Sequence, residues 1–243
     1  MNPAVPAVFK PELEVPLVRE FFADTPRGFF VEVGANDPKK DSQSWHLEEA
    51  GWRGILVEPL PELASELRRL RKAKVFEVAC SSPDRAGQTM QLHVAGPFSS
   101  FDPNLAVTGM RADRAIDVKV ETLDYVLKGG DAPRPIDLMS VDVEGHELEV
   151  LSGFDFERWR PRLILLEDHV SSLDKHRFMK RSGYRLMRRT GLNGWYVPRA
   201  DAPAMDLFGR WQIFRKYYLA LPLRMFRDWR RRRRDRIRFR ESA

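Results

Sequence analysis

The chain has a single cysteine, no long apolar run and no apolar leader. Cys80 is the one cysteine among 243 residues, so no disulfide framework can form within the chain. It follows the apolar run 75–79, which favours a buried thiol at a strand end and is compatible with a reducing compartment. No run approaches the roughly 18 apolar residues that span a bilayer, and no charged-then-apolar segment opens the chain. We therefore expect a cytoplasmic protein.

Glycine-rich phosphate loops are also absent. A dinucleotide site needs G-x-G-x-x-G, so that backbone N–H groups and a helix amino terminus can approach a pyrophosphate. The turn after the apolar run 29–33 contains only Gly34, in the order Gly-Ala-Asn-Asp-Pro-Lys. This composition disfavours a nicotinamide or flavin dinucleotide as the cofactor.

The excess of positive over negative charge lies entirely in the carboxyl-terminal segment. The formal net charge is +6, yet residues 224–240 alone hold ten arginines and two aspartates. The rest of the chain is therefore slightly acidic, which makes a basic nucleic-acid cleft in the body of the protein an unfavourable interpretation. We expect nucleic acid not to be the partner, and any polyanion to meet the carboxyl-terminal segment.

Apolar runs alternate with helical patterns, which is typical of βαβ units and an α/β fold with a mostly parallel, Rossmann-like sheet. Strands are predicted at 29–33, 54–58, 75–80, 90–94, 116–120, 136–142 and 162–167, and an antiparallel closing hairpin at 184–188 and 194–198. Helices are predicted at 41–50, 61–72, 123–127, 145–152 and 174–182. The predicted division is a lead-in segment at 1–27, a Rossmann-like domain at 28–200 and an aromatic, arginine-rich segment at 201–243.

Acidic residues end the first two predicted strands. Glu58 lies about 20 residues beyond the first turn, where a carboxylate can bind the ribose hydroxyls of an adenosine cofactor. Glu32 lies beside Gly34, and a nearby carboxylate suits the cationic amino acid end of S-adenosylmethionine, which carries no phosphates. The alternative is an ordinary strand–helix turn that happens to contain a glycine.

A second group of polar residues lies at the ends of the predicted strands 136–142 and 162–167, which are neighbours in the predicted parallel sheet. Asp142, Glu144 and His146 stand at the end of the first of these strands, and Glu167, Asp168 and His169 stand at the end of the second. Neighbouring strand tips open on one crevice, where a histidine or carboxylate can serve as an acid or base. The alternative is that the acids favour a helix amino terminus and the histidines pack or cap.

The same oxygen-rich group also suits a metal ion. Asp142, Glu144 and Glu167, with Asp168 beside them, could hold Mg²⁺, which takes one or two carboxylates together with water and substrate oxygens. Zinc is disfavoured because one cysteine and scattered histidines do not make a structural ligand set. Acidic clusters in cofactor clefts also have uses without a metal.

Several motifs in order resemble the FkbM family of S-adenosylmethionine-dependent methyltransferases. They are Glu32-x-Gly34-Ala-Asn-Asp, Gly51-Trp-x-Gly-x-Leu-Val-Glu58-Pro, Thr122-Leu-Asp124 and Ser140-x-Asp142-x-Glu144-Gly-His146-Glu147 with its continuation to Gly153. The resemblance covers roughly residues 28–198 and implies the class I methyltransferase fold. Many members have a glycine where this chain has Asp37-Pro38, so the turn differs in detail.

The resemblance also implies roles for individual residues. Glu32, Gly34 and Asn36 would line the methionine end of S-adenosylmethionine, and Glu58 would hold its ribose. The acceptor would face Asp142, Glu144 and His146 as catalytic residues. Members act mostly on hydroxyl oxygens of sugars and natural products, so the expected acceptor is a glycan, glycolipid or related small molecule.

Aromatic residues recur at steps of three and four in the carboxyl-terminal segment. Phe208, Trp211, Phe214, Tyr218, Leu221, Met225 and Trp229 draw one apolar stripe along a helix with a kink at Pro222. A stripe of this kind with basic flanks is typical of a helix that lies on an anionic membrane surface. Packing on the domain, pairing in a dimer and a solvated arginine run are the alternatives.

Three functions remain open from the sequence. The first is an O-methyltransferase for a small molecule or glycan, working on lipid-linked sugars at the inner membrane face. The second is a nucleic-acid-modifying methyltransferase recruited by the arginine-rich tail, although no Asn/Asp-Pro-Pro-Tyr/Phe motif is present. The third is a module that binds the cofactor without catalysis.

Overall fold

The computed structural model describes residues 11–102, 114–170, 172–201, 207–227 and 229–230. Its helices are α1 (Pro11–Phe21), α2 (Trp45–Glu49), α3 (Pro61–Leu70), α4 (Leu123–Gly129), α5 (Glu147–Ser152), α6 (Phe156–Trp159), α7 (Asp174–Arg181) and α8 (Leu207–Ile213), with a 3₁₀ turn at Pro83–Arg85 and a π-helical stretch at Phe214–Leu219. Its strands are β1 (Phe29–Val33), β2 (Arg53–Val57), β3 (Lys74–Phe76), β4 (Ala79–Cys80), β5 (Thr89–Val94), β6 (Arg114–Glu121), β7 (Leu138–Val141), β8 (Leu163–Glu167), β9 (Tyr184–Thr190) and β10 (Asn193–Pro198).

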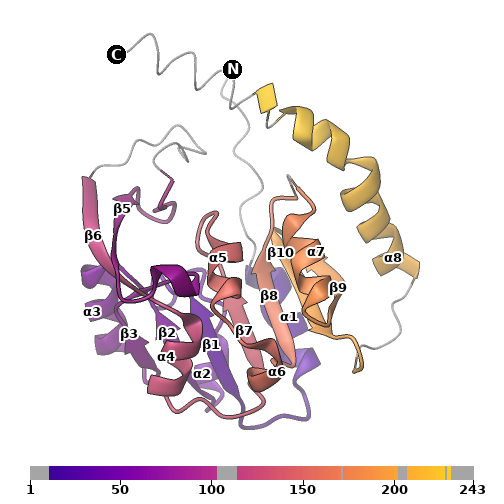
Figure 1. Ribbon diagram of the computed structural model, residues 1–243. Coiled ribbons are helices and arrows are strands. Elements are labelled where there is room, and N and C mark those ends of the chain that lie inside the picture. The colour runs from indigo at the N-terminus through magenta and orange to yellow at the C-terminus, as the bar shows by residue number, and fades with distance from the viewer. Residues whose placement is uncertain (1–10, 103–113, 171, 202–206, 228, 231–243) are drawn as a thin grey trace.

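A seven-stranded sheet in the order β3-β2-β1-β7-β8-β10-β9 forms the centre of the molecule (Figure 1). Five neighbouring strands of this sheet are parallel, namely β3, β2, β1, β7 and β8. Strand β10 pairs antiparallel with both β8 and β9. The order reverses between β1 and β7, and a doubly wound sheet binds its ligand outside the carboxyl ends of the strands at such a point. The predicted α/β class and the closing hairpin are confirmed.

The central strands are buried on both faces because helices cover the sheet on both sides. All five residues of β1 and all five of β8 are buried, as their largely apolar sequences predict. Phe30, Leu56 and Leu138 belong to one apolar cluster, whereas Val31 and Ile55 belong to another on the opposite face. This two-sided core holds the strand tips rigidly in place.

A second, three-stranded sheet in the order β4-β6-β5 lies beside the carboxyl ends of the main sheet. The predicted strand 75–80 is divided between the two sheets, since β3 pairs with β2 but β4 pairs with β6. The predicted strands 90–94 and 116–120 pair antiparallel as β5 and β6. The connection between them supplies Ser99, Ser100 and Phe101, and residues 103–113 lie outside the described part of the chain.

The predicted lead-in segment contains a helix that packs on the main sheet. Val18 and Phe22 are buried in the same apolar cluster as Trp52 and Trp195. The carboxylate of Glu14 accepts hydrogen bonds from the Thr190 hydroxyl at 2.7 Å and the Asn193 amide at 3.2 Å. The boundary placed after residue 27 therefore does not separate α1 from the core.

The carboxyl-terminal segment is helical, but a π-helical stretch and a bend interrupt its regular α-helical hydrogen bonding. Helix α8 continues into the π-helical stretch Phe214–Leu219, and residues 221–227 and 229–230 are again helical. The bend falls at Ala220, two residues before Pro222, whose missing N–H produces the predicted kink. Within the described ranges, every helix is too short or too polar to cross a bilayer. Residues 202–206 and 231–243 of this predicted segment lie outside the described part.

Candidate active site

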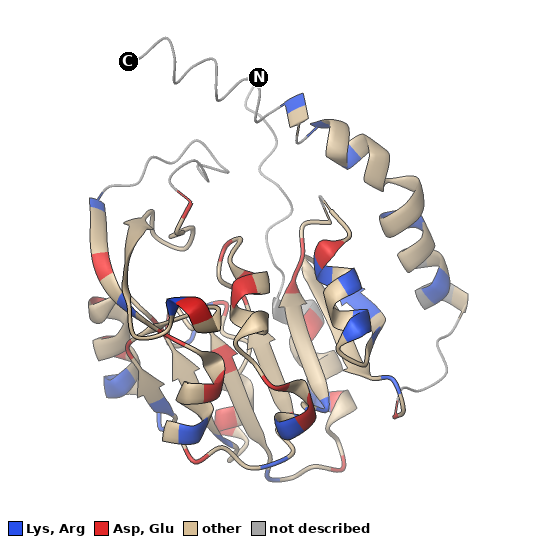
Figure 2. Ribbon diagram, viewed as in Figure 1, with Lys and Arg blue, Asp and Glu red and all other residues tan. Residues whose placement is uncertain are grey.

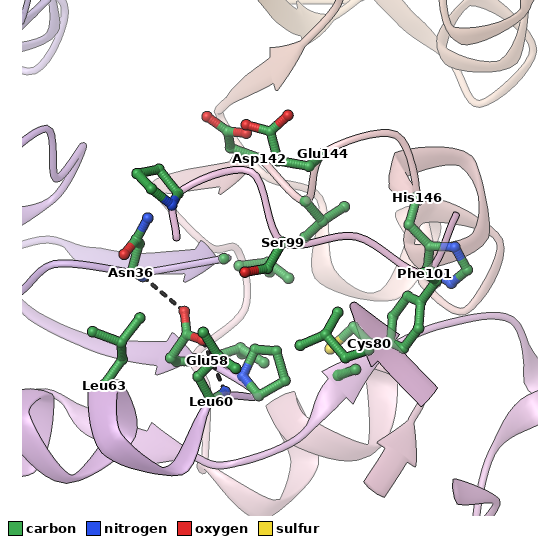
Figure 3. Close-up of a pocket in the computed structure, with 18 of the residues that line it drawn as sticks. Asn36, Glu58, Leu60, Leu63, Cys80, Ser99, Phe101, Asp142, Glu144 and His146 are labelled. Atoms are coloured by element: carbon green, nitrogen blue, oxygen red, sulfur yellow. Dashed lines mark hydrogen bonds between the residues drawn. The ribbon is translucent and has the colours of Figure 1, made fainter. Parts of the chain in front are cut away.

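The tips of β1, β2 and β7 meet at one pocket (Figure 3). Gly34 follows β1 with a φ of +82°, and a Cβ atom there would lie 1.9 Å from the carbonyl oxygen of Asp142. Only glycine fits this close approach, which brings the first turn directly against the tip of β7. The requirement for Gly34 is thus steric as well as conformational.

Glu58 lies at the tip of β2 and is buried in the pocket wall. Its two carboxylate oxygens accept the backbone N–H of Asn36 at 2.8 Å and of Leu60 at 2.9 Å. Asn36 has a φ of 48°, a left-handed conformation that asparagine tolerates better than most residues. Burial raises the pKa of Glu58, while the two backbone hydrogen bonds oppose that rise. The carboxylate is therefore held in one orientation facing the pocket.

The remaining pocket wall is largely apolar near Glu58. Leu60, Leu63, Val78 and Ala79 line it, and Cys80 lies beside them. Burial raises the pKa of the Cys80 thiol to about 12, with the Glu121 carboxylate as the second cause. Since the thiolate is the reactive form, Cys80 is not a nucleophile at neutral pH.

Glu32 lies outside this lining, on the other side of β1. Its carboxylate accepts the Ser42 hydroxyl at 3.0 Å and the Gln43 backbone N–H at 2.7 Å, and also the Ser44 hydroxyl. Burial raises its pKa, against the hydrogen bond of Ser44 and the nearby Arg71. The described contacts make Glu32 a support for the turn before α2, and its expected contact with the methionine end stays a prediction.

His146 lines the opposite side of the pocket from Glu58. Its Nε2 lies 2.9 Å from the Ser81 hydroxyl, and its ring centroid lies 4.9 Å from that of Phe101. The Nδ1 atom is 3.8 Å from the Glu149 carboxylate. Burial lowers the pKa of His146, so the imidazole is neutral at pH 7. Ser81 and Phe101, for which the sequence carried no motif, hold the ring in place.

Four carboxylates gather between the tips of β7 and β8: Asp142, Glu144, Glu147 and Glu167. We call them the acidic cluster. Two cations lie within it, because Lys175 Nζ is 2.5 Å from Glu147 and His169 Nε2 is 3.0 Å from Glu167. Glu147 belongs to the sequence motif but was not among the expected catalytic residues, and Lys175 was missed because nothing local marks it.

The acidic cluster shares protons, because so many carboxylates cannot all ionise in a buried space. Burial, followed by the charge of Glu167, raises the pKa of Glu144 to about 8. The same causes, with Glu144 and Glu147 added, raise the pKa of Asp142 well above its usual range. Although burial opposes it, the hydrogen bond from His169 lowers the pKa of Glu167, and this contact in turn raises that of His169.

The expected metal ligands are only partly reproduced. Glu144, Glu167 and His169 each offer a donor atom, and these atoms lie within 4.8 Å of one another. Asp142 is not in this group, and His169 brings a nitrogen where Mg²⁺ prefers oxygen. Because Lys175 and His169 already supply positive charge there, the described donor set does not fit Mg²⁺ well, and the ion remains an untested prediction.

Asp168 turns away from the acidic cluster, contrary to the sequence interpretation that grouped it with Glu167. Adjacent residues at a strand end point to opposite faces. The Asp168 carboxylate accepts the Tyr217 hydroxyl at 2.8 Å and the Val170 N–H at 2.7 Å, and lies 3.4 Å from the Arg189 guanidinium. It fastens the carboxyl-terminal segment instead of lining the site.

Of the expected site residues, the structure brings Gly34, Asn36, Glu58, Asp142, Glu144 and His146 to one pocket. Residues 32–186 match the family model described as Methyltransferase FkbM domain, which is more than half of the chain. The chain belongs to the FkbM methyltransferase family. Membership places it among methyltransferases and implies S-adenosylmethionine as the methyl donor.

Two relatives are less informative. The chain is 32% identical over 75 residues to hexuronic acid methyltransferase AglP of Haloferax volcanii, an alignment that covers 29% of this chain. In that alignment the chain spans 31% of the relative's length. A solved structure of precorrin-6y C5,15-methyltransferase from Geobacter metallireducens is 13% identical with a TM-score of 0.38, covering 81% of this chain and 91% of that chain. A likeness this weak carries no argument.

Proposed function

We propose that the chain is an S-adenosylmethionine-dependent O-methyltransferase that acts on a hydroxyl of a glycan, glycolipid or related small molecule. One observation carries the proposal: a single pocket has the fixed carboxylate of Glu58 at one end and Asp142 and Glu144 of the acidic cluster at the other. The first end suits a ribose, and the second suits a reacting hydroxyl.

The cofactor end is formed by Gly34, Asn36 and Glu58. Backbone N–H groups already orient the Glu58 carboxylate, and its remaining acceptor positions can take hydrogen bonds from two ribose hydroxyls. The apolar wall of Leu60, Leu63 and Val78 suits the face of an adenine ring. When bound there, S-adenosylmethionine supplies an electrophilic methyl group on a sulfonium.

The acceptor end must align a hydroxyl oxygen with the methyl carbon and remove its proton. As the new C–O bond forms, the C–S bond breaks, its electron pair goes to sulfur, and the proton passes to a carboxylate. Glu144 suits this role, because a base with a pKa of about 8 is matched to operation near neutral pH. Because Asp142 and Glu144 influence each other's protonation, the negative charge that remains when one proton leaves is shared between the two carboxyl groups.

His146 has a different role in this proposal. One ring nitrogen faces the Ser81 hydroxyl and the other faces Glu149, so the imidazole is held by its neighbours on both sides. We assign it to the wall that orients the acceptor, and assign the proton transfer to Glu144.

A sugar fits the acceptor end by its chemistry. Hydroxyl groups donate to carboxylates, and Asp142 and Glu144 of the acidic cluster line the pocket as such acceptors. The partial similarity to a methyltransferase named for a hexuronic acid supports a sugar acceptor. The slightly acidic body gives no support to the nucleic-acid alternative.

The proposal is tested with full-length protein, isotopically labelled S-adenosylmethionine and a panel of glycans, glycolipids and RNA, with product analysis by mass spectrometry. We expect methyl transfer to an oxygen of a glycan or glycolipid. Methyl transfer to RNA alone would establish the nucleic-acid alternative. Tight cofactor binding with no transfer to the whole panel, and no difference between the wild type and Glu144→Gln, would favour the module without catalysis.

A further inference from the structure

The carboxyl-terminal segment carries a large exposed apolar surface. Nine large apolar residues of this segment are each between 47% and 83% exposed, whereas Tyr125 is the one comparable residue in the rest of the described chain. The set is Leu207, Trp211, Phe214, Tyr218, Leu219, Leu223, Met225, Phe226 and Trp229. An apolar surface of this extent on one element marks an interaction site.

The opposite face of the segment is anchored to the domain. Tyr217 is only 1% exposed, donates its hydroxyl to Asp168 at 2.8 Å and accepts from Arg189 at 2.8 Å. Ile213 and Leu221 pack against the same apolar core. These inward contacts fix how the helix is rotated about its axis. The exposed aromatic residues therefore face away from the domain.

The aromatic side chains on the outer face form two ordered groups. Trp211 and Phe214 have ring centroids 6.1 Å apart, and Phe214 stacks on Tyr218 at 5.9 Å. Beyond the bend at Ala220, Phe226 stacks on Trp229 at 5.9 Å. Figure 1 shows the segment rising beside the β9 and β10 hairpin, and its far end extends past the sheet.

Basic residues accompany these rings. Residues 207–230 contain five arginines and one lysine against one aspartate, and the described part of the tail shows only basic charge (Figure 2). Arg215, Lys216 and Arg224 lie close together beside Arg189. After burial, the charges of these arginines are the causes that lower the pKa of Lys216 to about 8. A surface anion would relieve this repulsion.

We infer that the helical carboxyl-terminal segment, described over residues 207–227 and 229–230 and called the tail here, docks the protein on an anionic lipid bilayer. Its aromatic face lies in the headgroup region, and its arginines lie against lipid phosphates. Trp, Tyr and Phe favour the boundary between headgroups and acyl chains, and each nearby basic residue adds attraction to anionic lipid. A second copy of the chain is a poor occupant, because a two-fold contact would bring equal basic surfaces together. Within the described ranges, no helix is suited to span the bilayer, so the geometry is that of a surface contact.

Flotation of full-length protein tests this inference with phosphatidylcholine vesicles and with vesicles that also contain phosphatidylglycerol. We expect binding to the second kind only, and weakening as salt rises, because screening shortens the reach of the charges. Arg215→Gln with Arg227→Gln should weaken binding about 30-fold, at about fivefold per charge. Trp211→Ala, Phe214→Ala and Tyr218→Ala together should weaken it more than about tenfold.

Matched controls lie elsewhere on the surface. Arg53→Gln with Lys72→Gln removes the same charge, and Tyr125→Ala removes an aromatic that is 57% exposed. Both should bind vesicles as the wild type does, and thermal melting should show every variant folded. The inference is overturned by equal binding to both kinds of vesicle. It also fails if the protein does not float but is retained on nucleic acid, or forms a dimer that the aromatic substitutions dissociate.

Discussion

Glu58 offers the clearest test at the scale of a single residue. Its carboxylate is fixed by Asn36 and Leu60, so Glu58→Gln removes charge with little change in shape. Loss of charge-assisted hydrogen bonds to the ribose should weaken binding of S-adenosylhomocysteine by about 1.5–3 kcal/mol in titration calorimetry. Glu66→Gln on the exposed face of α3 is the matched control and should not alter affinity. Unchanged affinity in Glu58→Gln would remove this residue from the cofactor site.

Glu144 and His146 are distinguished by the pH dependence of turnover. A base must be deprotonated to act, and burial beside Glu167 raises the pKa of Glu144 to about 8. If Glu144 is the base, kcat/KM should therefore increase with pH up to about 8 and then level off. Since burial lowers the pKa of His146, a histidine base would place this limb below the ordinary histidine value of 6.5.

Substitution completes this test. Glu144→Gln should lower kcat by about 10²–10⁴-fold while leaving the affinity for S-adenosylhomocysteine nearly unchanged. The exposed Glu157→Gln on α6 is its control. A wild-type rate in Glu144→Gln, or an acid limb below pH 6.5 in the wild-type profile, would transfer the role to another group.

The docking of α1 belongs to the scale of an element, and it depends on the protonation of Glu14. Burial raises the pKa of Glu14 to about 7, against hydrogen bonds from Thr190 and Asn193. A carboxyl whose folded pKa is raised stabilises the fold fully below its unfolded value of 4.5, and this contribution is lost as pH rises through about 7. Thermal melting should therefore show the wild type losing stability between pH 5 and pH 9.

Glu14→Gln provides the comparison for α1. The amide cannot ionise, so the variant should keep its stability at pH 9 and exceed the wild type there by about 2–3 kcal/mol. At pH 5 the two proteins should be similar. Parallel pH profiles for wild type and variant would show that Glu14 does not control the docking of α1.

The elements differ in how far the sequence predicts them. The strands β1, β7 and β8 are predictable because a sheet covered on both faces favours largely apolar strands. The division of 75–80 into β3 and β4 is not, since pairing with the distant β6 decides where the main sheet ends. Helix α1 was missed, because Pro16 and a mixed polar pattern obscure its amphipathic face.

The residues of the site can likewise be predicted from the sequence only in part. Residues that follow strand tips, such as Glu58 and Asp142, are predictable from the geometry of parallel sheets. Lys175 enters the acidic cluster from α7, and only the folded chain brings it to Glu147. The opposite orientations of Glu167 and Asp168 follow from the two-residue period of a strand and could have been predicted. Which face of the tail meets the domain could not, because Tyr217 and Tyr218 are adjacent aromatics with opposite fates.

At the scale of the whole molecule, the tail and the site are linked by two adjacent residues at the end of β8, Glu167 and Asp168. Asp168 anchors Tyr217, while its neighbour Glu167 belongs to the acidic cluster. The domain-facing side of the tail is therefore anchored one residue away from the acidic cluster at the acceptor end of the pocket. This arrangement favours an acceptor that is itself attached to a lipid, because both partners would then meet on one surface at a raised effective concentration.

If both proposals hold, the full-length enzyme should methylate a lipid-linked glycan in phosphatidylglycerol vesicles about 100-fold faster than the same glycan free in solution at limiting concentration. The triple variant of Trp211, Phe214 and Tyr218 should lose this advantage and keep its rate on the soluble glycan, because those residues are exposed and are not part of the pocket lining. Tyr125→Ala should retain both rates. Equal rates on the two acceptors, with vesicle binding intact, would mean that the membrane holds the enzyme for a purpose other than its acceptor.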